Sequence, residues 1–262
     1  MDGATGTKEK DVERRFVQQT AVITGGADGL GRAISGRIGA EGGAIALFDV
    51  NEAKMIAAEK DLTAQGVSVS CHVVDVSDET SVEAGFREVM TRHGQVDIMV
   101  NCAGIVGPSG IKTSEVDGDG FEWVVRVNTI GSFFMTKHAL RVMIPRNYGR
   151  ILLIASIAGK EGNAGMSAYS TSKAGVVGLV KATGKEFAET GITVNGLAPA
   201  VIKTAMLDDI PPEQIKYMTD KIPMKRLGLL EEVASLSAWI VSKEASFNTG
   251  FVFDLSGGRA TY

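Results

Sequence analysis

The sequence predicts an α/β protein with a Rossmann-type doubly wound parallel sheet of about seven strands and helices on both faces. Short runs rich in Val, Ile and Leu alternate with amphipathic stretches along the chain. A glycine-rich turn, residues 25–31, directly follows the first apolar run. The 262 residues are 44% hydrophobic, which is enough to bury one large core. Together these observations favour a single domain.

The elements can be assigned in chain order. Strands are expected where short apolar runs end in turn residues, at 19–24, 43–49, 67–74, 96–101, 150–155, 192–197 and 250–254. Helices are expected where apolar residues recur with helical spacing, at 29–41, 51–65, 78–93, 121–146, 167–190 and 230–241. We expect residues 17–262 to form one dinucleotide-binding catalytic domain after a polar N-terminal extension, residues 1–16. Residues 200–228, with Pro211, Pro212 and Pro223, break the alternation and are predicted to be a substrate lid.

Composition and charge argue against several functions. The net charge of −4 does not indicate the basic surface that binds nucleic acid or an anionic membrane. Residues 1–16 lack the apolar core of a signal peptide, and no apolar run approaches the ~20 residues of a membrane span, so a cytoplasmic protein is expected. Cys71 and Cys102 fit a reducing compartment, and His72, His93 and His138 lack metal-ligand spacing. No metal site is predicted.

The first candidate motif is the glycine loop with the acid that follows the next strand. Glycines let the backbone turn tightly and approach a pyrophosphate, and the free N–H groups at the following helix N-terminus attract that anion. The spacing Gly25-x3-Gly29-x-Gly31 differs from the common Gly-x-Gly-x-x-Gly pattern, and such a turn can be purely structural. Asp49, at the end of the second strand, lies where a dinucleotide fold places an acid beside the adenosine ribose.

The second candidate motif combines Ser156, Tyr169 and Lys173. On a helix, residues four apart share one face, so the Lys173 ammonium could hold down the pKa of the Tyr169 phenol. A phenol normally titrates near ~10 and needs such a neighbour to act as a base at neutral pH. Ser156 follows an apolar strand and could instead be a capping hydroxyl. A Tyr-x-x-x-Lys pair alone also occurs by chance on solvated helix faces.

These motifs resemble those of the classical short-chain dehydrogenase/reductase family. The resemblance extends from about Val17 to about Gly258 and is specific because the motifs occur jointly, in order and at the right spacing. It also rests on the following positions: Thr24, Asp75-Val76, Asn101-Cys102-Ala103-Gly104, Asn128, Asn195, Pro199 and Thr204. Two positions depart from the family pattern. Cys102 stands where a second Asn is frequent, and Ala200 stands where Gly usually follows Pro.

The resemblance implies that Tyr169 is the general acid/base in hydride transfer between a secondary alcohol and a nicotinamide. Lys173 is expected to lower the pKa of that phenol and to hold the nicotinamide ribose. Ser156 is expected to bind the substrate oxygen. Asn128 resembles the family's Asn that helps a water connect the lysine to solvent, although a mid-helix Asn can also satisfy a neighbouring loop.

The expected cofactor is NAD, because NADP would need a cation beside its 2′-phosphate where this chain has Asp28 and Asp49. We expect Asp75 and Val76 near the adenine, and the backbone of Ile202 at the carboxamide. The predicted cofactor-binding residues are Thr24, Gly25, Asp28, Gly29, Leu30, Gly31, Asp49, Asp75, Val76, Asn101, Ala103, Gly104, Tyr169, Lys173, Pro199, Ile202 and Thr204.

The expected substrate is a sugar, sugar acid or hydroxy acid, because residues 105–120 and 159–166 are polar and rich in glycine, unlike a steroid pocket. The lid residues Met206, Leu207, Ile210 and Met218 could face the core or touch an acyl chain. One alternative is therefore a 3-oxoacyl-carrier-protein reductase, which usually takes NADPH and needs a basic patch for its carrier. A second is a non-catalytic dinucleotide-binding protein, since fold alone never settles function. Family members that lost activity generally lose the Tyr or the Lys.

A homotetramer is also expected. The helical patterns at 121–143 and 167–188 carry more apolar and small residues than one buried stripe needs, which indicates a second contact face. In the resembling family these helices pair across a two-fold axis, and a second two-fold near the last strand completes a tetramer. The alternative is that the sheet and lid cover both faces within one subunit. The tail, residues 253–262, is predicted to pack at a subunit interface.

Overall fold

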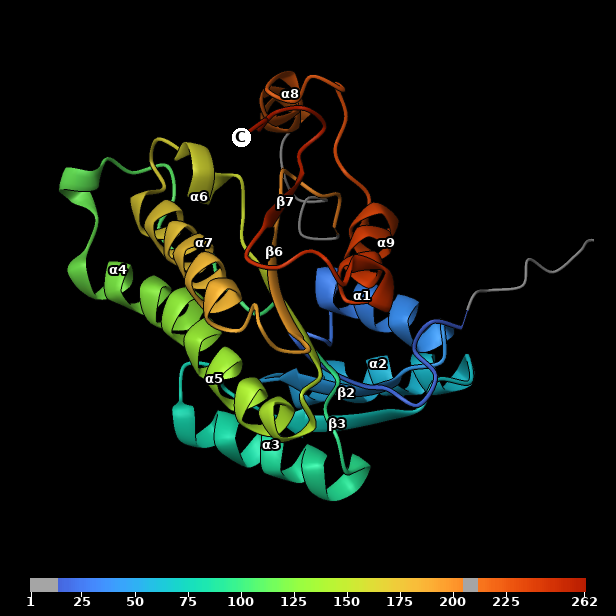
Figure 1. Cartoon of the computed structure of the whole chain (residues 1–262). Coiled ribbons are helices and arrows are strands. Elements are labelled where there is room, and N and C mark those ends of the chain that lie inside the picture. Colours follow the sequence, from blue (N-terminus) through green and yellow to red (C-terminus); the bar gives the residue numbers. More distant parts are fainter. Residues whose placement is uncertain (1–13, 205–211) are drawn as a thin grey trace, which may run out of the picture.

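Seven parallel strands form one sheet, in the order β3-β2-β1-β4-β5-β6-β7. The structure is a computed structural model that describes residues 14–204 and 212–262 (Figure 1). The strands are β1 (Thr20–Thr24), β2 (Ala44–Asp49), β3 (Val69–Val73), β4 (Ile98–Asn101), β5 (Gly149–Ile154), β6 (Ile192–Pro199) and β7 (Val252–Leu255). Met206, Leu207 and Ile210 of the predicted lid lie outside the described residues, as do residues 1–13 of the predicted extension.

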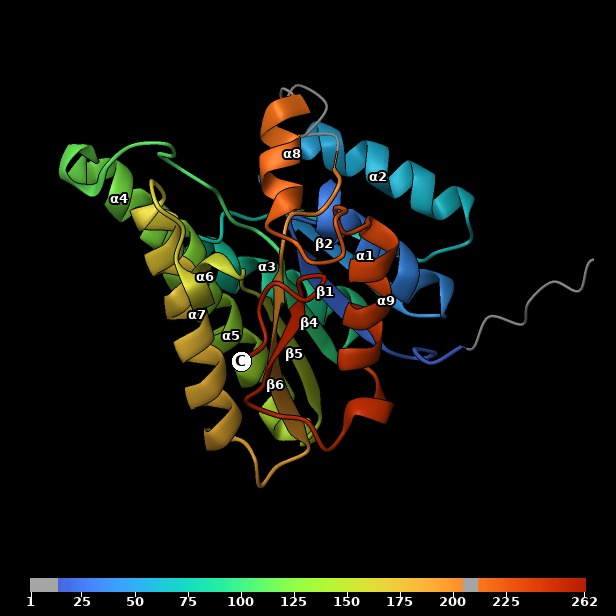
Figure 2. The same cartoon turned by 90° about the horizontal axis from the view of Figure 1, so that it is seen from above.

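Helices cover both faces of the sheet, as Figures 1 and 2 show from two directions. One face carries α3 (Glu79–His93), α4 (Gly118–Val125), α5 (Gly131–Met143) and α7 (Ser167–Glu186). The other carries α1 (Gly29–Ala40), α2 (Glu52–Ala64) and α9 (Leu230–Ile240). The short helices α6 (Ala158–Glu161) and α8 (Pro212–Asp220) follow β5 and β6 in the chain. The predicted doubly wound fold class is therefore confirmed.

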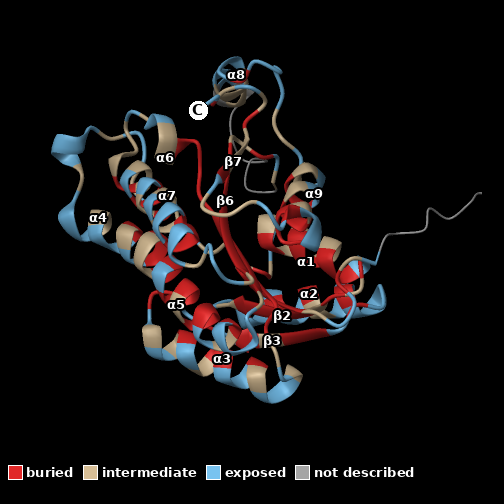
Figure 3. Ribbon diagram, viewed as in Figure 1, coloured by how far each residue is buried: buried red, intermediate tan, exposed pale blue. Residues whose placement is uncertain are grey.

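The core consists of two apolar layers, one on each face of the sheet. Val22, Ile151 and Leu153 point into the layer shared with α3, α5 and α7. Their neighbours Ile23 and Leu152 point into the layer shared with α1, α2 and α9. Side chains alternate between faces along a strand, so a parallel sheet covered on both sides is apolar at consecutive positions. Figure 3 shows that most of the strand residues are buried.

Several boundaries differ from the prediction. The expected helix over 121–146 begins earlier, where Asp117 caps Gly120 N–H at 3.0 Å, and is interrupted by a π-helical turn, η2 (Arg126–Ile130). The expected helix over 167–190 ends at Glu186. Helices α6 and α8 were not expected, and α8 begins at Pro212, a residue tolerated at a first helical position. Three 3₁₀ turns complete the described elements: η1 (Thr113–Glu115), η3 (Ile144–Arg146) and η5 (Lys243–Ala245).

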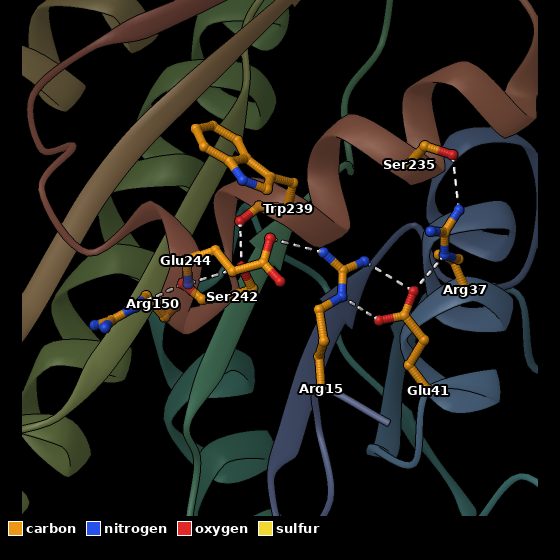
Figure 4. A network of polar contacts seen from close by, with 8 residues as sticks. All are labelled: Arg15, Arg37, Glu41, Arg150, Ser235, Trp239, Ser242 and Glu244. Atoms are coloured by element: carbon orange, nitrogen blue, oxygen red, sulfur yellow. Dashed lines mark hydrogen bonds and ion pairs between the residues drawn. The ribbon is translucent and has the colours of Figure 1, made fainter. Parts of the chain in front are cut away.

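An ion-pair network fixes the end of α1 that lies away from the glycine loop (Figure 4). Arg15 donates two hydrogen bonds to the Glu41 carboxylate, at 2.6 and 2.8 Å, and Arg37 donates a third. Burial opposes ionisation of Glu41, but the hydrogen bonds from Arg15 and Arg37 hold the pKa of this carboxyl below its ordinary value. Arg37 also reaches Ser235 of α9 at 2.7 Å. The network thus joins α1 to α9 far from the glycine loop.

Within residues 14–204 and 212–262, none of the helices is both long and apolar enough to cross a membrane.

Candidate active site

The carboxyl ends of the strands surround a cavity of about 850 Å³. Parallel strands end at the same edge of a sheet, so the loops that follow them converge there. Most of the predicted site residues line this cavity: Gly25, Asp28, Gly29, Leu30, Gly31, Asp49, Asp75, Val76, Ala103, Gly104, Ser156, Tyr169, Lys173, Pro199, Ile202 and Thr204. The structure therefore brings together residues from the carboxyl ends of six strands, β1 to β6, and from α7, between positions 25 and 204 of the chain.

The glycine loop leads into the start of α1 and lines the cavity. A Cβ added to Gly31 would lie 2.2 Å from the carbonyl oxygen of Gly25, so only glycine allows the loop to fold this tightly onto the helix. Asp28 caps the helix by accepting a hydrogen bond from Gly29 N–H at 2.7 Å. A helix N-terminus with a tight glycine loop is a suitable site for a pyrophosphate.

Two carboxylates border the end of the cavity next to the glycine loop. Asp49 accepts hydrogen bonds from Asn51 N–H at 3.0 Å and Ala27 N–H at 3.3 Å, which fix it at the end of β2. Asp28 lies 2.7 Å from Lys54 Nζ. The hydrogen bond from Lys54, and after it the one from Gly29 N–H, holds the pKa of the Asp28 carboxyl below its ordinary value. The Lys54 ammonium is thus paired with Asp28.

Thr24 and Asn101 are buried behind the cavity wall. Thr24 Oγ1 donates to Asn101 Oδ1 at 2.7 Å and accepts from Ala103 N–H at 3.0 Å. Asn101 Nδ2 donates to Ser132 Oγ at 2.9 Å. These two predicted cofactor residues therefore join the ends of β1 and β4 and position the loop at Ala103, which itself faces the cavity.

Ser156 and Tyr169 both line the cavity. Ser156 also accepts a hydrogen bond from Ala158 N–H at 3.1 Å, so it serves as a local cap as well. Burial raises the pKa of the Tyr169 phenol above its ordinary value, and the hydrogen bond with Ser156 offsets this in part. The phenol is therefore protonated at neutral pH in the protein without cofactor.

Lys173 is buried on the face of α7 that also carries Tyr169. Its Nζ donates a hydrogen bond to the Ile154 carbonyl at 2.8 Å and lies 5.8 Å from the centroid of the Tyr169 ring. Burial lowers the pKa of the Lys173 ammonium to about 8. Burial and Ser156 set the direction of the Tyr169 pKa, and the effect of Lys173 on this phenol stays a prediction.

Asn128 lies in the π-helical turn and connects the loop after β4 to α7. Its amide nitrogen donates to the Ile105 carbonyl at 2.8 Å and to Ser172 Oγ at 2.9 Å, and its oxygen accepts from Ile105 N–H at 2.8 Å. A Cβ placed on Gly104 would lie 2.9 Å from Asn128 Oδ1 and 3.4 Å from Lys173 Nζ. Asn128 therefore satisfies a neighbouring loop, and its oxygen and Lys173 Nζ both lie beside Gly104.

A comparison with known proteins identifies the family of this chain. Residues 19–215 match the family model described as short chain dehydrogenase. The chain belongs to the short-chain dehydrogenase family. The predictions of family and of oxidoreductase class are thereby confirmed.

The chain is similar over most of its length to individual dehydrogenases and reductases. This short-chain dehydrogenase is 43% identical over 250 residues to the 2-dehydro-3-deoxy-L-rhamnonate dehydrogenase (NAD(+)) of Sphingomonas sp. (strain SKA58), which covers 95% of this chain and 98% of that protein. It is 32% identical to a 3-oxoacyl-acyl-carrier-protein reductase of Thermotoga maritima, over 93% of this chain and 98% of the relative. A crystal structure of NAD⁺-bound xylitol dehydrogenase superposes with a TM-score of 0.89 at 29% identity, covering 93% of this chain and all of that one.

Some cavity residues of this short-chain dehydrogenase were not singled out from the sequence. Val50, Ile105, Val106 and Trp123 also line the cavity. Val50 directly follows Asp49, and Ile105 and Val106 belong to the loop 105–120 that was expected beside the substrate, so Trp123 is the one of these four without such a signal. Cys102, where the family often has Asn, lines the cavity too, and burial raises the pKa of its thiol to about 12. This thiol is neutral and contributes no charge to the site.

Asn195, one of the family positions, lies away from the cavity. Its amide nitrogen donates to the Asn248 carbonyl at 2.7 Å, and its oxygen accepts from Phe251 N–H at 3.3 Å. Asn195 is fully buried in β6. These contacts fix the chain that leads into β7, so the residue supports the sheet.

Proposed function

We propose that this protein is an NAD-dependent dehydrogenase that interconverts a small polar secondary alcohol, with a sugar acid as the first candidate, and its ketone. The observation that carries the proposal is the placement of Ser156, Tyr169 and Lys173 on one side of the cavity, with Asp28 and Asp49 on the glycine-loop side. The names of the Sphingomonas relative and of the xylitol dehydrogenase agree with this cofactor and substrate class.

In the proposed reaction the glycine loop would hold NAD, and the chemistry that this cofactor would supply is acceptance of a hydride from the alcohol carbon. Ser156 and Tyr169 would both hydrogen-bond the substrate oxygen, since both line the same cavity. Tyr169 would accept the alcohol proton during oxidation and donate it during reduction. Ser156 would stabilise the charge that develops on that oxygen.

We propose that Lys173 acts after cofactor binding. Its ammonium is partly deprotonated near neutral pH because burial lowers its pKa to about 8. Its present acceptor is a backbone carbonyl, Ile154, so a ribose hydroxyl would be a second partner within the same buried region. A fully charged Lys173 would then favour the phenolate form of Tyr169.

The cofactor-binding roles are proposed from where the residues lie around the cavity. Gly25, Gly29, Leu30 and Gly31 would hold the pyrophosphate, with Asp49 accepting hydrogen bonds from the adenosine ribose. The remaining contacts would come from the strand-end residues that line the cavity: Asp75, Val76, Ala103, Gly104, Pro199, Ile202 and Thr204. A 2′-phosphate would meet Asp49 and Asp28, which disfavours NADP.

The second candidate, a 3-oxoacyl-carrier-protein reductase, is favoured by the Thermotoga relative at 32% identity. The paired carboxylates weigh against the NADPH that we expect of such an enzyme. A non-catalytic protein would not need Ser156, Tyr169 and Lys173 to converge on one cavity.

A substrate panel tests the three possibilities. Purified protein is mixed with NAD or NADP and with sugars, sugar acids, hydroxy acids and secondary alcohols, and reduced nicotinamide is followed by its absorbance. Turnover with NAD and a polyhydroxylated acid supports the proposal. Reduction of acetoacetyl thioester with NADPH would favour the second candidate, and saturable binding without turnover the third.

We also propose a cytoplasmic homotetramer in which each subunit is one catalytic domain, residues 17–262. Apolar side chains remain exposed where the contact faces are expected. Phe133 on α5 is 46% exposed, and Phe251, beside β7, is 57% exposed. Phe251 packs on Phe253 with ring centroids 4.8 Å apart, so an aromatic patch borders the last strand. Both cysteines are free, as expected in a reducing compartment.

A further inference from the structure

The C-terminal tail of this chain is tied to α6 by two ion pairs. Lys160 Nζ lies 2.9 Å from a carboxylate oxygen of Asp254 in β7. Arg259 Nε lies 2.9 Å from Glu161 Oε2. The Lys160 and Arg259 side chains are only 10% and 12% exposed, so removing the partner of either would leave a poorly hydrated charge. These contacts should therefore hold more firmly than ion pairs on open surface.

Further hydrogen bonds fix the tail against the same region. Arg259 Nη2 donates to Asn163 Oδ1 at 3.0 Å. The Tyr262 hydroxyl donates to the Lys160 carbonyl at 2.7 Å, and Lys160 Nζ lies 5.1 Å from the centroid of the Tyr262 ring. Figures 1 and 2 both show the C-terminus near α6. The tail thus makes its described contacts within its own subunit.

The region held by the tail, called here the clasped segment (residues 158–166), connects β5 to α7. A Cβ added to Gly159 would lie 2.5 Å from the carbonyl carbon of Lys173, so α6 packs directly on the turn of α7 that carries the lysine. Asn163 N–H donates to Ser170 Oγ at 3.0 Å, next to the proposed catalytic tyrosine. A displacement of the clasped segment would therefore act on both functional residues of α7.

We propose that Arg259 is a positioning residue that, through Glu161 and Asn163, holds the clasped segment against α7 and so keeps Ser156 and Tyr169 aligned on the substrate oxygen. The inference rests on the proposed dehydrogenase function. One planar guanidinium serves both partners, through Nε to Glu161 and through Nη2 to Asn163. A lysine ammonium reproduces only part of this geometry.

Hydrogen–deuterium exchange of the full-length protein tests the proposal without relying on turnover. In Arg259→Met, exchange of the clasped segment should rise by roughly tenfold or more, and Arg259→Lys should fall between the variant and the wild type. Arg37→Met is the matched control. It removes an Arg–Glu contact at the far end of α1, where Arg15 still pairs with Glu41, and should leave exchange of the clasped segment unchanged.

Steady-state kinetics and the molar mass of the assembly in solution complete the test. Arg259→Met should raise KM for the alcohol by roughly fivefold or more and lower kcat, with NAD affinity within about twofold of wild type. Arg259→Lys should recover part of both. Unchanged exchange in Arg259→Met would overturn the proposal. So would a loss of subunit association that accompanies the kinetic defect, because the tail would then act through assembly. If wild-type protein oxidises no alcohol, the dehydrogenase proposal fails, while exchange still decides the positioning role.

Discussion

Replacing Tyr169 by Phe removes the proposed proton donor and little else. The ring stays packed, and Ser156 keeps its hydrogen bond from Ala158 N–H at 3.1 Å, so no buried hydroxyl is left unpaired. The loss of one hydrogen bond should lower the free energy of unfolding by only about 1 kcal/mol. Loss of general acid/base catalysis should lower kcat/KM by at least ~10²-fold, or about 2.7 kcal/mol in the activation free energy.

Initial rates of NADH formation with the best alcohol of the panel measure this effect, with NAD affinity from fluorescence titration as the control. We expect the affinity of Tyr169→Phe for NAD to stay within about twofold of wild type, because the phenol hydroxyl acts on the substrate oxygen. The double variant with Ser156→Ala should be little worse than Tyr169→Phe alone, since residues that act as one unit are not additive. Near-normal turnover in Tyr169→Phe would refute its role as acid and base.

Three further predictions concern Lys173, cofactor choice and assembly. Lys173→Ala should lose activity and bind NAD more weakly; unaltered NAD affinity would leave the lysine only an electrostatic role. Burial lowers the pKa of Lys173 from 10.5 to about 8, so its contribution to the unfolding free energy of the protein without cofactor should increase by up to roughly 3 kcal/mol as pH rises from below 8 to above 10.5. Denaturant titrations should show this increase in wild type and lose it in Lys173→Met. The ratio of kcat/KM for NAD to that for NADP should be at least ~10, about 1.4 kcal/mol, and equal efficiencies would contradict the role of Asp49. Asp28→Arg with Asp49→Ser should shift preference toward NADP, because Lys54, now paired with Asp28, would add a second cation. Light scattering with size exclusion should give about four times 27.6 kDa, and a monomer at micromolar concentration would exclude the tetramer.

The sheet and the outline of the cavity could be predicted because both follow from local patterns. β1, the glycine turn and the start of α1 are contiguous in the sequence, and Gly31 is required by a backbone contact only six residues away. Once the strands are parallel, Asp49 and Ser156 must lie at the same edge, whatever the details of packing. The sequence pattern was therefore sufficient to predict that these strand-end residues lie together.

The contacts that shape the site chemistry depend on tertiary packing and could not be predicted in this way. The π-helical turn forms where Asn128 and Thr129 hydrogen-bond Ser172 of α7, at 2.9 and 2.8 Å, and spacing in the helix gives no sign of it. Lys173 was expected to act on Tyr169, but its burial and its bond to Ile154 are set by β5. Helix α8 was missed because its paired prolines indicated only a loop.

A comparison of the two substrate classes tests the central claim most directly. Values of kcat/KM are measured for NAD-dependent oxidation of polyhydroxylated acids and for NADPH-dependent reduction of acetoacetyl thioester, with wild type and Tyr169→Phe side by side. The account predicts that the best hydroxy acid with NAD exceeds the thioester with NADPH by at least ~10-fold, and that Tyr169→Phe lowers kcat/KM for hydroxy-acid oxidation by at least ~10²-fold. A thioester reaction that is faster with NADPH, or a hydroxy-acid oxidation that survives in Tyr169→Phe, would contradict it.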